Sequence, residues 1–97
     1  MATLVILDLK LKPEAVAPLK ETLKVILPDT RAYAGCKGVT FHSNKDDPTN
    51  VIAVEHWETK EAYQKYLAWR TETGVMAQLG AMLAAPPSIR YFDVVDA

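Results

Sequence analysis

The chain has 97 residues, which is the size of one domain and excludes a two-domain enzyme. Hydrophobic residues make up 49% of it and charged residues 24%, a balance that supports a packed core and excludes a largely disordered chain. Eleven basic and twelve acidic residues give a net charge of -1, so no excess of cations is available for nucleic acid or its phosphates. We expect a single domain over residues 1–97.

The N-terminal residues lack the basic segment and the apolar run of a signal peptide, and the single Cys36 cannot form an intramolecular disulfide. We therefore expect a cytoplasmic protein. No apolar run approaches the roughly 20 residues that a bilayer requires, so we expect no membrane span.

The first predicted strand covers residues 3–12, where a continuous apolar run gives way to alternation. Pro13 ends it and suits the first turn of a helix. In the helix that follows, apolar residues recur at steps of three and four: Val16, Leu19, Leu23, Ile26 and Leu27. Pro28 is predicted to kink this helix or to restart it as a second segment, and Gly35 to end it.

Residues 38–43 and 51–57 are the second and third predicted strands, and the turn-rich segment between them indicates a hairpin. Thr59 is the expected N-cap of a second helix. The pattern is interrupted at residues 71–74, resumes from Val75, and ends at the two prolines that precede a last strand over 89–95.

This order of elements predicts an α+β, ferredoxin-like split βαβ fold with an antiparallel sheet. Helices would cover one sheet face, yet the first and third strands are apolar on both. One face holds Val5, Leu7, Leu9, Ala53 and Trp57, and the other holds Leu4, Ile6, Ile52 and Val54. Because the chain has no further element to cover the second face, we expect a second copy there, and hence a homodimer.

Two short motifs carry a resemblance to a known family. Gly35-Cys36 precedes the second strand, and Glu55-x-Trp57 ends the third, immediately before the capped helix. With the element order, this pattern resembles the antibiotic biosynthesis monooxygenase (ABM) domain family over nearly the whole chain. The resemblance implies a dimeric α/β barrel formed through sheet faces, with a small pocket between sheet and helices in each copy.

The family includes cofactor-free monooxygenases that convert polycyclic phenols to quinones, haem-degrading enzymes and proteins without a known substrate. Haem-degrading relatives combine a strand-one Asn, a Trp and an iron-binding helix His. Here the Asn position is Leu7 and no His follows Trp57, so haem degradation is not expected. Quinone-forming relatives use an Asn that corresponds to Ala53, and many bacterial members carry a helix His at the position of Tyr66.

We therefore expect Trp57, Tyr66 and Arg70 to be catalytic, with Arg70 holding a phenolate, a Tyr hydroxyl passing a proton and Trp57 stacking on the ring. Tyr63, Tyr66 and Arg70 share a helix face at i, i+3 and i+7. The expected substrate-binding residues are Tyr63, Leu7, Ala53 and Met76. The alternative is that Trp57 and Tyr63 are core residues and that Arg70 lies at a solvated helix end.

We expect no cofactor, because the chain has no Gly-rich phosphate loop, no GxGxxG and no pair of cysteines. His42 and His56 match no recognised metal spacing, so no metal is expected, and Cys36 is interpreted as a small apolar residue at a turn. The sequence favours a cofactor-independent monooxygenase acting on a small aromatic or quinone-like metabolite. The alternative function is a non-catalytic dimeric small-molecule-binding or stress-related module of the same fold.

Overall fold

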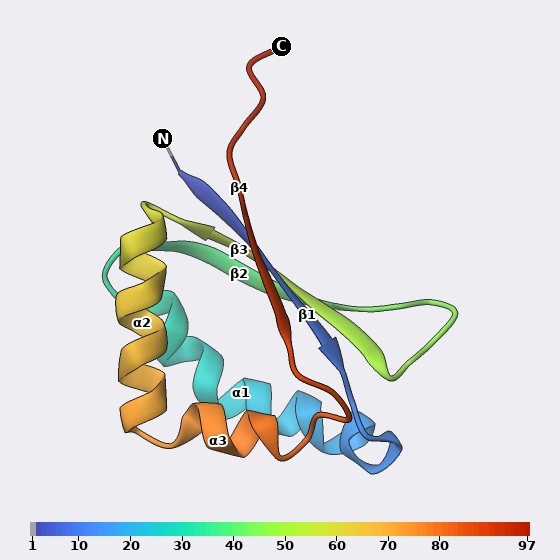
Figure 1. The fold of residues 1–97 in the computed structure, drawn as a ribbon. Helices are drawn as coiled ribbons and strands as arrows, with labels where there is room; N and C mark the ends of the chain where they lie inside the picture. The colour runs from blue at the N-terminus through green and yellow to red at the C-terminus, as the bar shows by residue number, and fades with distance from the viewer. Residues whose placement is uncertain (1) are drawn as a thin grey trace.

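A computed structural model describes residues 2–97 and contains the elements in the predicted order (Figure 1). The strands are β1 (Thr3–Lys10), β2 (Cys36–Ser43), β3 (Asn50–Trp57) and β4 (Ser88–Phe92). The helices are α1 (Val16–Ala32), α2 (Lys60–Glu72) and α3 (Val75–Gly80), and a 3-10 turn over Pro13–Ala15 precedes α1. Among the described residues, none of these helices is both long and apolar enough to cross a membrane.

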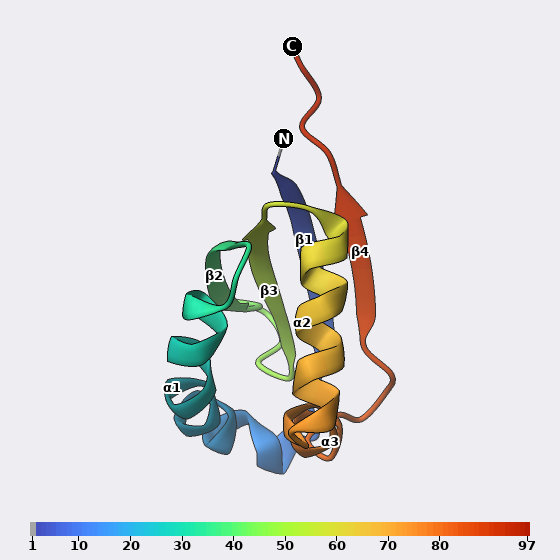
Figure 2. The ribbon, with the colours of Figure 1, turned by 90° about the vertical axis from the view of Figure 1, so that its left-hand side faces the viewer.

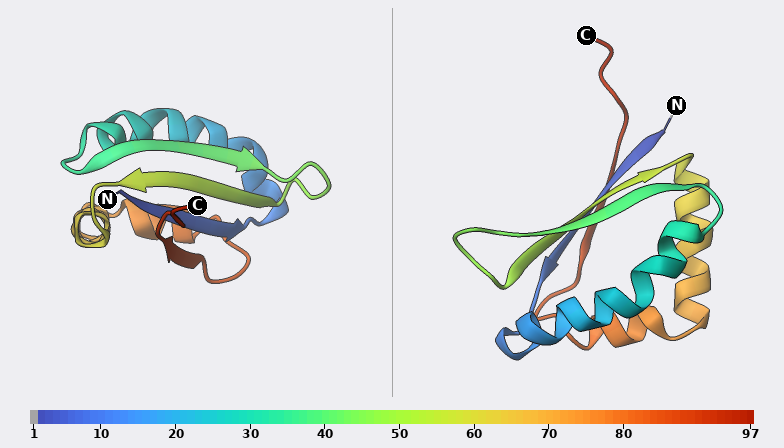
Figure 3. Two further views of the ribbon diagram at one scale, coloured as in Figure 1. Left: turned by 90° about the horizontal axis from the view of Figure 1, so that it is seen from above. Right: turned by 180° about the vertical axis from the view of Figure 1, so that it is seen from behind.

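The strands form an antiparallel sheet in the order β2-β3-β1-β4. Ala53 of β3 lies opposite Leu7 of β1 on one side and Phe41 of β2 on the other, so the predicted hairpin of β2 and β3 is confirmed. The three helices lie on one side of the sheet (Figures 1 and 2). The turn that joins β2 to β3 reaches beyond this helical layer (Figure 3). The ferredoxin-like α+β architecture is thus confirmed.

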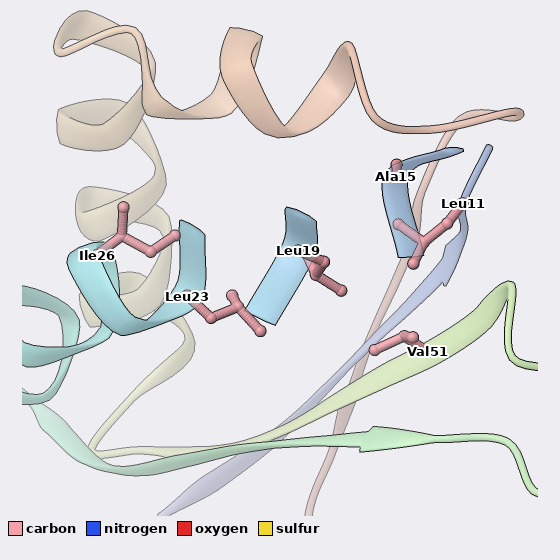
Figure 4. Close-up of a cluster of buried hydrophobic side chains, with 6 residues drawn as sticks. All are labelled: Leu11, Ala15, Leu19, Leu23, Ile26 and Val51. Carbon is pink, nitrogen blue, oxygen red and sulfur yellow. The ribbon is translucent and has the colours of Figure 1, made fainter. Parts of the chain in front are cut away.

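Side-chain alternation along the strands separates the two sheet faces as predicted. Val5, Leu7 and Leu9 of β1 are buried against the helices, whereas Leu4 and Ile6 between them are only half-buried on the opposite face. The largest apolar cluster joins the buried side of α1 to the segment after β1 and to the start of β3 (Figure 4). It contains Leu11, Ala15, Leu19, Leu23, Ile26 and Val51.

The prediction that Pro28 kinks or restarts the first helix was wrong. α1 runs without interruption from Val16 to Ala32 with Pro28 inside it. Proline removes one backbone donor, while the buried stripe on α1 continues on both sides of it through Ile26 and Thr30. Packing of that stripe against the sheet therefore outweighs the loss of one backbone hydrogen bond at Pro28. The helix ends three residues before Gly35.

The first and last strands are shorter than predicted. β4 ends at Phe92 rather than at residue 95, because Phe92 lies opposite Leu4 and β1 offers no further partner beyond Thr3. The chain then leaves the sheet (Figure 1). β1 ends at Lys10 rather than at residue 12, and Leu11 forms only an isolated bridge to Leu83.

Candidate functional site

An aromatic cluster lies where the end of β3 meets α2 and the end of α1. The Thr59 side chain caps α2 by accepting a hydrogen bond of 3.0 Å from the Ala62 N–H, as predicted. The cap sets the start of α2 and so places Tyr63 and Tyr66 on its buried face. The Trp57 ring, fully buried, has its centroid 5.5 Å from that of Tyr63 and 5.0 Å from that of Tyr66.

Glu55 places a carboxyl group beside this cluster. It lies two residues before Trp57 on β3, so both side chains face the helices, and only 4% of Glu55 is exposed. The Trp57 Nε1–H donates a hydrogen bond of 3.0 Å to Glu55 Oε1. Burial raises the pKa of Glu55, and the indole hydrogen bond offsets part of that rise. Glu55 therefore has the character of a proton-transfer group in an apolar setting.

A second buried polar group consists of Arg70, Tyr66 and Thr30. Arg70 donates from Nε to the Tyr66 hydroxyl at 2.9 Å and from Nη2 to Thr30 Oγ1 at 2.8 Å. Arg70 Nη2 also donates to the Ile26 carbonyl at 2.6 Å, and the Thr30 and Tyr66 hydroxyls lie 2.6 Å apart. The interpretation of Arg70 as a solvated helix end is therefore wrong, since only 4% of it is exposed. Arg70 instead fixes the position of the Tyr66 hydroxyl.

The Arg70 charge has no carboxylate partner among the ion pairs of residues 2–97. Its hydrogen-bond acceptors are a backbone carbonyl and two hydroxyls, all uncharged groups. A buried cation without a counter-ion favours negative charge nearby. The site thus combines a buried carboxyl of raised pKa with an electropositive group.

A small, partly open cavity of about 30 Å³ lies among these groups. Its polar lining comes from Glu55, Tyr63, Tyr66 and Thr30. Its apolar lining consists of Leu7, Ile26, Leu27, Val39, Phe41, Leu67, Met76 and Leu79. This volume is sufficient for one water molecule.

The structure divides the predicted site residues into two layers. Leu7, Tyr63, Tyr66 and Met76 line the cavity. Trp57, Ala53 and Arg70 do not line it: Trp57 and Arg70 contact the lining residues Glu55 and Tyr66 from behind, and Ala53 lies in the sheet between Leu7 and Phe41. The direct stacking of Trp57 on a ring and the direct contact of Arg70 with a phenolate remain predictions.

Two residues of this site, Glu55 and Thr30, were not predicted. The signal for Glu55 was present in the strand alternation, which places Glu55 on the same face as Trp57 and Ala53. A carboxyl on the buried face of a strand is unusual enough to mark a site. Thr30 extends the buried stripe of α1 by one turn from Ile26, but nothing in the sequence indicated that Arg70 would reach it.

The remaining candidates lie away from the cavity. His42 lies opposite Ile52 and His56 opposite Gly38, so the two histidines are not cross-strand neighbours. Within residues 2–97, no three His, Cys, Asp or Glu side chains lie close enough together to hold a metal ion. Cys36 is half-buried, and burial raises the pKa of its thiol, which makes it less reactive.

The substitution Glu55→Gln should change how stability depends on pH. The folded state holds the Glu55 pKa above its unfolded value of about 4.3, so folding favours the protonated form. The contribution of Glu55 to the free energy of unfolding is therefore fully present below the unfolded pKa and declines as pH rises toward the folded pKa. The glutamine of the variant does not titrate and retains an oxygen for the Trp57 indole. Urea unfolding from pH 4 to 8 should show the variant gaining stability relative to wild type as pH rises, and a relative loss would contradict a raised pKa.

The family is established by sequence. Residues 3–71 match the family model described as antibiotic biosynthesis monooxygenase, so the chain belongs to that family. The match contains β1, α1, β2, β3 and most of α2, and it includes Glu55, Trp57, Tyr66 and Arg70. No curated protein matches the chain.

Solved structures resemble the protein over its whole length. The Rv0793 protein of Mycobacterium tuberculosis is 21% identical with a TM-score of 0.84, covering 100% of this chain and 98% of its own. A conserved protein of Methanosarcina mazei Go1 is 17% identical with a TM-score of 0.85, covering 95% and 91%. A structure described as an antibiotic biosynthesis monooxygenase is 20% identical with a TM-score of 0.83, covering 99% and 100%. At these identities the likeness establishes the fold.

Proposed function

We propose that this protein is a cofactor-independent monooxygenase that oxidises a small aromatic, quinone-forming metabolite. The single observation that carries the proposal is Glu55, whose carboxyl is buried with a raised pKa and which lines the same cavity as Tyr63 and Tyr66. Membership of the monooxygenase family supports the type of reaction. An apolar pocket with few polar groups suits a planar aromatic substrate.

The chemistry requires a base and a dry site, because the substrate supplies the electrons. Glu55 removes one proton from an acidic methylene group, and the electron pair of the carbanion adds to dioxygen to form a carbon-bound peroxide. The carboxylic acid of Glu55 returns that proton to the peroxide. Elimination then removes the second methylene proton together with hydroxide as water. The products are one ketone and one water, and both oxygen atoms are accounted for.

Arg70 and Tyr66 would stabilise the anion that forms in this sequence. The Tyr66 hydroxyl is held by Arg70 Nε and by Thr30, and the uncompensated guanidinium charge lies directly behind it. Tyr66 has a single hydroxyl proton, and Thr30 Oγ1 can donate either to the Ile26 carbonyl at 3.2 Å or to Tyr66. When Thr30 donates to Tyr66, the Tyr66 O–H is free to donate to a phenolate or enolate oxygen, and the Arg70 cation polarises it. In this arrangement Arg70 is a positioning residue and Tyr66 is the group that touches the substrate.

Substrate binding requires part of the cavity wall to move, since about 30 Å³ accommodates one water and not a ring. The exposure of the lining side chains indicates which part of the cavity wall can move. Leu27, Phe41, Leu67, Met76 and Leu79 are only half-buried, whereas Glu55 and Tyr63 are fully enclosed. We propose that the half-buried side chains change rotamer to admit the ring while the buried polar groups stay in place.

The test is oxygen consumption by the purified protein with a panel of anthrones and hydroquinones. Turnover should convert anthrone to anthraquinone, and labelled dioxygen should place one labelled atom in the product. Absence of oxygen uptake across the panel would contradict the proposal for these substrates.

A non-catalytic small-molecule-binding module is the second candidate. It is favoured by the Arg70, Tyr66 and Thr30 group, whose hydrogen bonds are made within the protein, and by the small cavity. Saturable binding of a hydroquinone with no oxygen uptake would distinguish this candidate from the enzyme.

We propose further that a second copy covers the outer sheet face. This face is apolar at its centre, because Ile6 of β1 lies opposite Val54 of β3, with Leu4 and Ile52 diagonal to that pair, and these side chains are only half-buried. Phe92 of β4 lies opposite Leu4 and is 41% exposed. An apolar patch of this kind, bordered by the polar side chains of Asp8, His56 and Arg90, is typical of an interface between copies.

The substitution Ile6→Lys should separate the copies. Ile6 lies between Val54 and Arg90 at the middle of the outer face, so a symmetric contact would bring charge into the apolar centre of the interface. Light scattering should give twice 10.7 kDa for wild type and 10.7 kDa for the variant. Lys65→Glu on the exposed face of α2 is a control that should stay dimeric, and a wild-type monomer would contradict the proposal.

A further inference from the structure

A second hollow, much larger than the proposed catalytic cavity, lies along the outer side of α1. It is an open groove of about 690 Å³ between α1, β2 and the hairpin turn. This volume falls within the range of small-molecule sites. The groove arises because the β2–β3 hairpin reaches beyond the helical layer, so the far end of β2 is not closed by α1 (Figures 1 and 3).

The floor of the groove is apolar along α1 from Val16 to Pro28. Leu19 and Leu23 of α1 and Val51 of β3 extend toward one another from the two sides (Figure 4). The other apolar lining residues are Val16, Leu27, Pro28, Phe41 and Pro48. Because the apolar residues of α1 recur at steps of three and four from Val16 to Leu27, they form one stripe about three turns long. An elongated apolar body fits such a floor better than a compact one.

The rim of the groove carries only cations among its charged side chains. Lys20, Lys24 and Arg31 line it from α1, and no Asp or Glu does. This is a local excess, since the chain as a whole has a net charge of -1. Lys20 has no hydrogen-bond or ion-pair partner within residues 2–97, while Lys24 pairs loosely with exposed Glu21 at 3.2 Å. Arg31 Nη2 donates to the Val39 carbonyl at 3.0 Å, which fixes its guanidinium at one end of the groove.

We propose that this groove binds an amphiphilic carboxylate, with its alkyl chain on the Leu19, Leu23 and Val51 floor and its carboxylate at Lys20 and Lys24, which neighbour each other on the rim at i and i+4. Apolar burial supplies the affinity and the cations select an anionic headgroup. The site does not depend on the proposed oxygenase reaction. It shares with the catalytic cavity only the two side chains of Leu27 and Phe41.

Titration calorimetry with decanoate, below its micelle-forming concentration, tests the proposal on the full chain. Decanoate should bind saturably with one site per chain, and decanol, which has the same chain length without the charge, should bind about tenfold more weakly. The double variant Lys20→Glu/Lys24→Glu should lose about tenfold or more in affinity for decanoate. Both lysines are exposed, so the fold should be retained.

The matched control is Lys37→Glu/Lys65→Glu, which changes the net charge by the same amount at exposed positions outside the groove. It should bind decanoate as wild type does. Equal losses of decanoate affinity in both double variants would show that decanoate responds to the overall charge of the protein, which would overturn the proposed site. The absence of saturable decanoate binding to the wild-type protein would overturn it as well. Amide chemical shifts should change along α1 and the end of β2. Chemical-shift changes confined to the outer sheet face would place the decanoate site there and overturn the proposal. A groove variant with an altered mass in light scattering would assign the groove to contact with a second copy and would also overturn it.

Discussion

Replacing Glu55 with glutamine is expected to lower kcat/KM for anthrone oxidation by roughly 10²- to 10⁴-fold, the contribution usual for a positioned general base. The glutamine preserves the size of the side chain and can still accept the Trp57 indole hydrogen bond, so the aromatic cluster should remain intact. The loss should then lie in kcat, because proton removal occurs in the reaction step and not in binding. Steady-state oxygen uptake measures both constants.

The pH dependence separates this role from a structural one. The wild-type rate should rise with pH as the Glu55 carboxyl ionises, with a midpoint above the ordinary range of a glutamate because burial raises its pKa. This ionisation should be missing from the variant. Glu58→Gln is the matched control, since Glu58 follows Trp57 on the exposed surface and does not line the cavity. Unchanged activity in Glu55→Gln, or an equal loss in the control, would exclude Glu55 as the base.

The second large effect is expected at Gly35, in the turn between α1 and β2. Its backbone has φ of +91°, a conformation that side chains disfavour, and a Cβ there would lie 2.7 Å from the Ala62 Cβ of α2. The Gly35 carbonyl also accepts a hydrogen bond of 2.7 Å from the Glu58 N–H, which ties this turn to the segment between β3 and α2. Gly35→Ala should therefore lower the free energy of unfolding by about 3 kcal/mol, because backbone strain and overlap add.

Two comparisons divide that cost into its causes. Gly74 has a similar φ of +84°, but a new Cβ there would meet open space. Gly74→Ala should therefore lower the free energy of unfolding only by the cost of backbone strain, roughly 1–2 kcal/mol. Adding Ala62→Gly to Gly35→Ala should recover stability, although Ala62→Gly alone is destabilising. Urea unfolding of the four variants measures this coupling. Additive losses in the double variant would show that the Gly35–Ala62 approach does not cause the effect.

The Gly35 contact also bears on the site. The turn and α2 approach each other closely only because neither Gly35 nor Ala62 carries a larger side chain. That approach brings the end of α1 to within reach of Arg70, whose Nη2 then bonds to Ile26 and Thr30. The Gly-Cys and Glu-x-Trp motifs of the sequence therefore mark the packing of α1, β2, β3 and α2 around the site as well as the site itself.

The sequence alone determined the order of the elements, the hairpin, the α2 cap at Thr59 and the two apolar sheet faces, because these follow from side-chain period and from local hydrogen bonding. Only the tertiary structure decided that α1 continues through Pro28, since a buried stripe stabilises the helix across a position that is locally unfavourable. It also decided which functional groups meet. Arg70 bonds to Thr30 across 40 residues of sequence, and burial raises the pKa of the Glu55 carboxyl only in the packed structure. Contacts between distant residues and the removal of water from a carboxyl depend on how whole helices and strands pack. A local sequence pattern does not contain that information.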